Sequence, residues 1–183
     1  MPARKEIPVQ IQAGTAAPEL DAGALRRELE SGIEGEVRFD PVSRALYSTD
    51  ASVYEIAPAG VVIPRNREDI LRSLEICRRH RCPITMRGGG TSQCGQSIGA
   101  GLQIDISKYY NRVLEVNAQE RWVRVEPGIV LDELNAQLAP LGLRFAPDIS
   151  TASRATIGGM LRIMPPARAA SGGAGPSTTS RKP

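Results

Sequence analysis

Arg-Gly-Gly-Gly-Thr-Ser-Gln-Cys-Gly-Gln, at residues 87–96, joins three successive glycines to a cation and two hydroxyl groups. Glycine has no Cβ and adopts positive φ angles, so successive backbone N–H groups can converge on an anion. Thr91 and Ser92 add hydroxyl donors, and Arg87 adds a positive charge. Because this stretch follows the apolar segment 82–86, it should lie at the end of a strand. The stretch therefore predicts a loop that binds phosphate or pyrophosphate.

Two known glycine-rich phosphate motifs match this loop only in part. The dinucleotide fingerprint G-x-G-x-x-G has its first two glycines at Gly88 and Gly90, but Gln93 stands at the third. The P-loop pattern G-x-x-x-x-G-K-[ST] fits from Gly90 to Ser97, except that Gln96 replaces its lysine. A plain glycine-rich turn between strands is a third interpretation at this point.

The residues on both sides of the loop predict strands that alternate with helices. Residues 60–64 read as a short buried strand and 83–86 as the next strand, and 102–106 alternates as a half-buried strand should. A helix between the first two strands should begin after Asn66, which is a good N-cap. The predicted apolar face of this helix consists of Ile70, Leu71, Leu74 and Cys77.

Further elements are expected nearer the two ends of the chain. Segments 25–30 and 41–47 predict short helices, and 36–39 predicts a strand. Residues 112–116 and 122–126 alternate as two strands joined by a polar turn. The helix that should follow them has one apolar face, formed by Leu131, Leu134 and Leu138.

Composition limits the classes of function. With 183 residues and 41% hydrophobic content the chain can bury a core, whereas 4% aromatic residues are too few for a single-stranded nucleic-acid platform. The net charge of +3 is modest and the basic residues are dispersed, so we expect no nucleic-acid partner. The three cysteines form no C-x-x-C pair, so no metal site is predicted. His80, the only histidine, should be a solvated partner of a helix dipole.

The sequence also bears on location. Residues 1–6 lack the apolar core of a signal peptide, and we expect no transmembrane segment. An odd number of cysteines then indicates reduced thiols in the cytoplasm. We expect Cys94 to be a small packing residue and Glu126 to be a strand-end charge without a chemical role.

Several segments occur in the order and spacing of a known family. They are 47–52, 61–64, 83–92, 125–128, 147–148 and 155–160. Together they resemble the FAD-binding domain of the vanillyl-alcohol oxidase and p-cresol methylhydroxylase (PCMH-type) family. Within that family the likeness is greatest to the FAD-linked oxidases of the glycolate oxidase and D-lactate dehydrogenase group. The resemblance covers about residues 40–160.

The resemblance implies an α+β fold of two subdomains with FAD between them, which is not a Rossmann fold. On this basis 1–20 is a flexible lead-in, 21–57 a helical lead-in and 58–110 the first FAD-binding subdomain with its phosphate loop. Residues 111–160 are the start of the second subdomain, which is truncated. Residues 161–183 depart from the family pattern. We expect them to be a disordered tail created by a frameshift, with a native linker as the alternative.

The resemblance also implies which residues hold the cofactor. The glycine loop should hold the pyrophosphate through backbone amides and hydroxyls, and Gln96 should reach toward the flavin. Covalent members of the family carry a histidine where this chain has Thr91, so FAD should be bound non-covalently. The expected cofactor-binding residues are Arg87, Gly88, Gly89, Gly90, Thr91, Ser92, Gln96, Pro147, Asp148, Thr151, Thr156, Ile157, Gly158 and Gly159.

The function implied by the resemblance is that of a flavin-dependent oxidoreductase. The intact protein should oxidise a small 2-hydroxy acid, similar to D-lactate or glycolate, by hydride transfer to flavin N5. In this family the base and the substrate clamp belong to a C-terminal domain. We therefore predict no catalytic residue in this chain, and expect the chain alone to be inactive and to bind FAD poorly.

Two other functions remain open at the level of the sequence. One is a stand-alone flavin- or nucleotide-binding module that works with a partner chain supplying the substrate domain. The other is a P-loop-like phosphate binder, although Gln96 argues against it. We expect a cytoplasmic protein, and an intact enzyme that can associate peripherally with the inner membrane.

Overall fold

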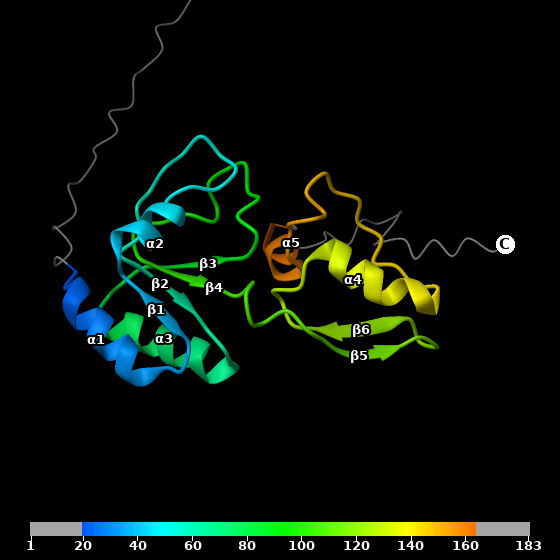
Figure 1. Cartoon of the computed structure of the whole chain (residues 1–183), viewed down its shortest axis with the longest axis horizontal. Helices are drawn as coiled ribbons and strands as arrows, with labels where there is room; N and C mark the ends of the chain where they lie inside the picture. The colour runs from blue at the N-terminus through cyan, green and yellow to red at the C-terminus, as the bar shows by residue number, and fades with distance from the viewer. Residues whose placement is uncertain (1–19, 164–183) are drawn as a thin grey trace, which may run out of the picture.

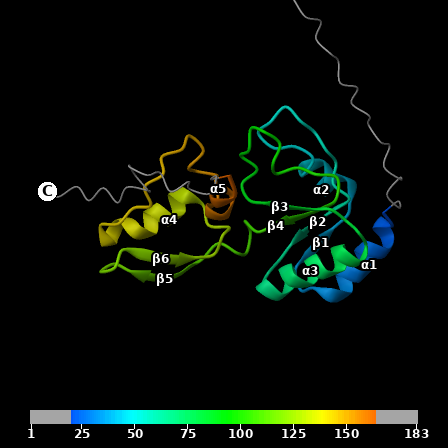
Figure 2. The same ribbon diagram turned by 180° about the vertical axis from the view of Figure 1, so that it is seen from behind.

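Two α+β units make up the computed structural model, which describes residues 20–163 (Figure 1). The first unit contains a four-stranded sheet and the second a two-stranded sheet. The two views in Figures 1 and 2 show the units side by side, joined by the segment that follows β4. The expectations for residues 1–19 and 164–183 lie outside the described residues.

The sheet of the first unit has the strand order β1-β2-β4-β3. Its strands are β1 (Glu36–Arg38), β2 (Gly60–Ile63), β3 (Ile84–Arg87) and β4 (Leu102–Asp105). The last three strands are parallel, whereas β1 pairs antiparallel with β2. Parallel strands need a crossover, and α3 (Arg67–Arg79) provides it between β2 and β3. The predicted strands and the predicted helix are confirmed.

Helices α1 (Ala22–Gly32) and α3 cover one face of this sheet, while α2 (Pro41–Leu46) lies on the other side (Figure 2). The N-cap Asp21 accepts a hydrogen bond from Ala24 N at 2.9 Å, so the first turn of α1 is capped. Residues 21–57 were expected as a helical lead-in, but they also contain β1, which pairs with β2 at the edge of the sheet. The buried core of this unit consists of Leu25, Leu29, Val62, Ile76, Cys77, Cys82, Leu102, Ile104 and Ile106.

The prediction that residues 102–106 form a half-buried strand is wrong. All four residues of β4 are buried, because the strand lies between β2 and β3 and is covered on both faces. Polar side chains form the second face, where Gln103 Oε1 is buried without a hydrogen-bond partner among the described residues. Gln103 Nε2 donates to the carbonyl of Tyr47 at 2.8 Å, and the Tyr47 hydroxyl donates to Asp105 Oδ2 at 2.6 Å. The apolar side chains of β4 thus face the core on one side of the sheet, and its polar side chains face Tyr47 on the other side, where they are also buried.

The predicted apolar face of α3 is wrong in part. Leu71 is 50% exposed and Leu74 is 39% exposed. The helix is positioned instead by Asp69, whose carboxylate accepts the backbone N–H groups of Glu34 at 2.9 Å and Arg65 at 2.8 Å. These bonds draw the beginning of α3 toward two connecting loops and rotate its leucines outward. The buried residues of α3 are Asp69, Ser73, Ile76 and Cys77.

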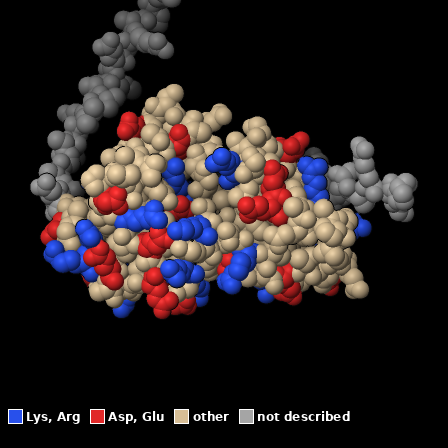
Figure 3. All heavy atoms as spheres, viewed as in Figure 1, with Lys and Arg blue, Asp and Glu red and all other residues tan. Residues whose placement is uncertain are grey.

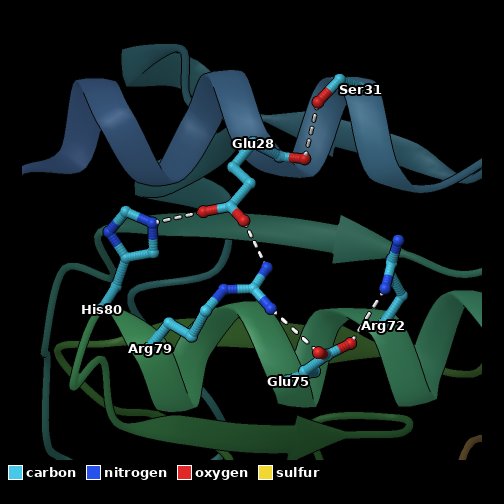
Figure 4. A network of polar contacts seen from close by, with 6 residues as sticks. All are labelled: Glu28, Ser31, Arg72, Glu75, Arg79 and His80. Atoms are coloured by element: carbon cyan, nitrogen blue, oxygen red, sulfur yellow. Dashed lines mark hydrogen bonds and ion pairs between the residues drawn. The ribbon is translucent and has the colours of Figure 1, made fainter.

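A polar network on the surface joins α1 to α3 (Figure 4). Glu28 of α1 contacts both Arg79 and His80, and His80 Nε2 lies 2.7 Å from Glu28 Oε2. The hydrogen bonds from His80 and then Arg79 lower the pKa of Glu28. The His80 side chain is only 19% exposed, so the expectation of a solvated helix-dipole partner is corrected.

The second unit is a β-hairpin covered by helices. The hairpin pairs β5 (Val113–Asn117) with β6 (Trp122–Val125), and α4 (Leu131–Leu138) follows it. A short 3-10 turn (Ala139–Leu141) ends α4, and α5 (Ile157–Ile163) ends the described chain. A two-stranded sheet alone is marginally stable in water, so the hairpin depends on these helices. The buried core of the unit consists of Ile129, Leu131, Leu134, Leu138 and Ile157.

Glu126 closes the open end of this hairpin. Its side chain is 5% exposed, and its carboxylate accepts a hydrogen bond from the backbone N–H of Arg112 at 2.8 Å and another from the Arg112 guanidinium at 2.8 Å. These bonds lower the pKa of Glu126. The strand-end charge expected here therefore has a structural role.

The surface shows no concentration of one charge on the face seen in Figure 3, where basic and acidic side chains alternate. Within residues 20–163, no helix is long and apolar enough to cross a membrane.

We predict that Ile104→Ala destabilises the protein by about 2–5 kcal/mol, because it opens a cavity in the fully buried central strand. Leu71→Ala removes a similar volume from the exposed side of α3 and should change the free energy of unfolding by at most about 0.5 kcal/mol. Urea titration of both variants measures the difference. Equal losses would contradict the burial of these two residues.

We also predict a pH-dependent effect of Glu126→Gln. The carboxylate has a lowered pKa in the folded protein, so its stabilisation is present above the unfolded value of 4.5 and is lost as the pH falls through the folded pKa. The variant should be less stable by about 1 kcal/mol near neutral pH. This difference should shrink in acid, and the exposed Glu115→Gln is the control. A difference that stays constant with pH would rule out the charged pair as its cause.

Candidate functional site

A cavity of about 460 Å³ opens between the two units. It lies where the parallel strands β3 and β4 end, at Arg87 and Asp105. Ligands of open sheets with parallel strands bind beyond the carboxyl ends of those strands, so the position is that of a binding site. The cavity is lined by Leu46, Tyr47, Arg87, Gly88, Gly89, Asp105, Ser107, Asn111, Val130, Glu133, Ser153, Arg154 and Thr156.

The backbone of the glycine loop presents unused donors. Within the described chain, the N–H groups from Gly88 to Gln93 donate no hydrogen bond, and neither does the Thr91 hydroxyl. Gly88 and Gly89 line the cavity, and Gly89 and Gln93 are exposed, so these donors are accessible to a ligand. A run of unpaired N–H groups beside a cavity is the arrangement that an anion such as pyrophosphate requires.

The three glycines of the loop are needed for different reasons. A Cβ on Gly88 would lie 2.1 Å from Thr156 Oγ1, and a Cβ on Gly89 would lie 2.0 Å from the carbonyl oxygen of Arg154. Both positions therefore let the second unit approach the loop. Gly90 instead has a φ of +64°, a backbone angle that residues with a side chain rarely adopt. The absence of Cβ atoms thus closes the contact between the units as well as exposing the amides.

Arg87 carries a charge that is free to meet an anion. One guanidinium nitrogen donates to the carbonyl of Ser97 at 3.2 Å, and the group lies 5.1 Å from the centre of the Tyr47 ring. It forms no ion pair with a carboxylate among the described residues. The nearby carboxylate of Asp105 is occupied by the hydroxyl of Tyr47 and by the N–H and hydroxyl of Ser107.

Tyr47 connects these groups. Burial, and then the hydrogen bond to Asp105, raise the pKa of Tyr47 well above its usual value, so the phenol remains a donor at neutral pH. The sequence reasoning assigned no role to Tyr47, although it opens the segment 47–52 that contributed to the resemblance. Asp105 was also not predicted as a site residue. Its position, an acidic residue at the end of a strand, is the sequence feature that could have indicated it. No sequence pattern pointed to Arg154.

Two other loop residues form a turn of their own. Ser92 is 8% exposed, its hydroxyl donates to Gln96 Oε1, and its oxygen accepts the N–H groups of Cys94 and Gln96 at 3.2 and 3.3 Å. Gln96 is exposed and does not line the cavity. Cys94 is exposed as well, so the expectation that it packs inside the protein is wrong.

In the second unit, Thr156 is the predicted residue that reaches the cavity. It is 1% exposed, and its Oγ1 accepts the N–H of Gly159 at 3.3 Å. Ile157 packs in the core of this unit, and a Cβ on Gly158 would lie 2.7 Å from Pro127 Cβ. Three further predicted residues lie in the loop between the 3-10 turn and α5, away from the cavity lining: Pro147, Asp148 and Thr151.

Four of the residues proposed for cofactor binding, Arg87, Gly88, Gly89 and Thr156, therefore meet at one cavity, and the other ten do not line it. Residues 20–163 contain no group of three His, Cys, Asp or Glu side chains placed to hold a metal ion. The unpaired amides, the free guanidinium and the cavity between two α+β units fit a dinucleotide with a pyrophosphate. The fold and the site together are those of a nucleotide-binding domain.

Comparison with protein families identifies this domain. Residues 58–163 match the model of the FAD binding domain family, and this match covers more than half of the 183 residues. The chain belongs to the FAD binding domain family. The predicted PCMH-type family and its cofactor, FAD, are thereby confirmed.

Curated relatives are much longer than this chain. The D-2-hydroxyglutarate dehydrogenase of Pseudomonas putida is 41% identical over 154 residues, which cover 82% of this chain and 15% of the relative. The glycolate oxidase subunit GlcD of Bacillus subtilis is 35% identical over 131 residues, which cover 69% of this chain and 28% of the relative. The chain thus spans well under a third of the length of these two relatives.

Solved structures agree with the predicted fold. An alkyldihydroxyacetonephosphate synthase superposes with a TM-score of 0.69 at 23% identity, covering 84% of this chain and 31% of the neighbour. The 4-ethylphenol oxidase of Gulosibacter chungangensis superposes with a TM-score of 0.60 at 25% identity, covering 69% of this chain and 25% of the neighbour. A p-cresol methylhydroxylase, with a TM-score of 0.54 at 16% identity, has the same fold. The α+β, PCMH-type fold is confirmed.

We predict that Gly89→Ala destabilises the chain by about 1–3 kcal/mol, because the new methyl group would overlap the backbone carbonyl of Arg154. The control is Gly23→Ala, the same chemical change in α1, where the nearest atom is the side-chain oxygen of Asp21 at 3.3 Å. It should change stability by less than about 1 kcal/mol, since alanine favours a helix. Urea denaturation compares the two, and an equal response would contradict the close contact between the units.

Proposed function

We propose that this chain is the FAD-binding part of an oxidoreductase that oxidises a 2-hydroxy acid. The relatives named above are a D-2-hydroxyglutarate dehydrogenase and a glycolate oxidase subunit, and a D-lactate dehydrogenase of Kluyveromyces lactis is 37% identical over 95 residues. All three names describe substrates with a hydroxyl beside a carboxylate. The proposed substrate class is therefore a small 2-hydroxy acid.

The observation that carries this proposal is the row of unpaired N–H groups from Gly88 to Gln93 beside the Arg87 guanidinium. We propose that these amides and Arg87 hold the FAD pyrophosphate, with Thr91 adding its hydroxyl. Charge-assisted hydrogen bonds of this kind are about twice as strong as neutral ones. The proposed binding site also includes Ser92 and Gln96 in the first unit, and it is completed from the second unit by Pro147, Asp148, Thr151, Thr156, Ile157, Gly158 and Gly159.

When bound, FAD supplies the acceptor for the hydride that leaves the substrate. The residues of this chain bind and orient that cofactor. Tyr47 and Asp105 hold Arg87 in place through the ring contact and the hydrogen bond described above. We assign no catalytic residue in this chain. Thr91 occupies the position at which covalent members carry histidine, which favours non-covalent binding.

We further propose that the substrate domain is supplied either by a further part of the same protein or by a partner chain. The share of the relatives that this chain spans supports both arrangements. The proposed location is the cytoplasm, with peripheral association of the intact enzyme with the inner membrane.

The proposal predicts that the chain binds FAD but not riboflavin, which has the same ring system without phosphates. Arg87→Gln should weaken FAD binding about tenfold, as expected for a lost charge-assisted hydrogen bond of about 1.5 kcal/mol. Equilibrium dialysis with FAD and riboflavin measures both effects, even when binding is weak.

The matched control is Arg78→Gln, which removes an exposed guanidinium at the far end of α3. It should leave FAD affinity unchanged. Riboflavin bound as tightly as FAD, or equal losses in the two arginine variants, would contradict a pyrophosphate site at Arg87.

A further inference from the structure

The end of helix α3 brings two cysteines together. The N–H of Cys82 donates to the carbonyl of Cys77 at 2.9 Å, and the N–H of Arg81 donates to the carbonyl of Arg78 at 3.3 Å. Arg81 has a φ of 51°, in the left-handed region. This pair of bonds around a left-handed residue is the Schellman motif. In that motif the side chains at the positions of Cys77 and Cys82 contact each other.

Both cysteines lie in the core of the first unit. Cys77 is completely buried and Cys82 is 6% exposed, whereas Cys94 is exposed. The Cys82 thiol donates to the carbonyl of Pro83 at 3.4 Å. The neighbouring Cys77 thiol lowers the pKa of Cys82 to about 7, and the same interaction raises the pKa of Cys77. Such an unequal pair has one thiol that ionises readily and a second that stays protonated beside it.

We propose that Cys77 and Cys82 are a redox site that forms a reversible disulfide within the chain. A disulfide requires two Cα atoms within about 7 Å and side chains directed toward each other. The Schellman motif supplies both conditions before any oxidation occurs. The proposal rests on this geometry and is independent of flavin binding.

The reaction with hydrogen peroxide balances as follows. The thiolate of Cys82, the more exposed sulfur, attacks one peroxide oxygen, and the O–O bond breaks to give a sulfenic acid and water. Cys77 then attacks the sulfur of Cys82, the S–O bond breaks, and a second water leaves. Two thiols are oxidised to one disulfide while one peroxide is reduced to two waters.

The disulfide would constrain the chain segment that leads into the glycine loop. It would join the end of α3 covalently to Cys82, two residues before the start of β3, and β3 ends at Arg87. No covalent bond between side chains holds the connection between helix and strand in the reduced protein, where backbone hydrogen bonds and packing of the two cysteines in the core stabilise it. Oxidation would therefore restrict local opening of the segment that leads to the glycine loop.

The test uses the full chain with Cys94→Ser, which removes the exposed thiol and leaves the buried pair. Hydrogen peroxide should convert this protein to a species lighter by two hydrogen atoms in its intact mass. After alkylation of the remaining free thiols, tryptic digestion without a reductant should yield one cross-linked product, with peptide 73–78 joined to peptide 82–87. Dithiothreitol should return the original mass and the two separate peptides.

Two single variants complete the experiment, Cys77→Ser and Cys82→Ser, each in the Cys94→Ser chain. Neither should lose two hydrogens, and the variant that retains Cys82 should react faster with a sulfenic-acid probe than the one that retains Cys77. If a serine variant does not fold, the peptide map of the Cys94→Ser chain still decides the question. Two free thiols after peroxide treatment, or linkage only between molecules, would overturn the proposal.

Discussion

The contact between the glycine loop and the segment around Thr156 is the constraint on which the site depends. Backbone from the first unit approaches backbone and a buried hydroxyl from the second so closely that no Cβ fits at Gly88 or Gly89. This contact forms one wall of the cavity and sets the distance between the two units. The absence of side chains also leaves the loop amides uncovered. Packing between the units and the proposed anion binding therefore both require glycine at these positions.

Tyr47 has a comparable role on the other side of the loop. It is bonded through its hydroxyl to Asp105 and through its carbonyl to Gln103, and its ring supports the Arg87 guanidinium. A buried carboxylate beside an arginine would ordinarily pair with it. Here Tyr47 and Ser107 satisfy the carboxylate instead, so the arginine keeps its charge for a ligand. The electrostatic character of the site therefore depends on a residue that does not belong to the glycine loop.

The sequence predicted element types better than exposure. Strands such as 60–64 and the helix after Asn66 followed from local patterns and capping, and the structure confirms them. The apolar face of α3 was wrong because periodicity cannot show how a buried carboxylate rotates a helix. The buried state of β4 was missed for a similar reason, since alternation in a strand does not reveal whether its polar side faces water or a second layer of protein. For the site, the cation and glycines of the loop were found from the sequence, while Tyr47, Asp105 and Arg154 were not.

The sequence by itself determined a glycine-rich loop at the end of a strand, a sheet with an α3 crossover, and membership of an FAD-binding family. These depend on local chemistry: on residues without Cβ, on capping side chains and on the order of short motifs. Only the tertiary structure decided which residues share the cavity and which two thiols touch. Those relations join parts of the chain that lie far apart, as with Gly89 and Arg154, or depend on one left-handed residue, as at Arg81. Periodicity does not encode the distances between such residues, because packing between elements sets them.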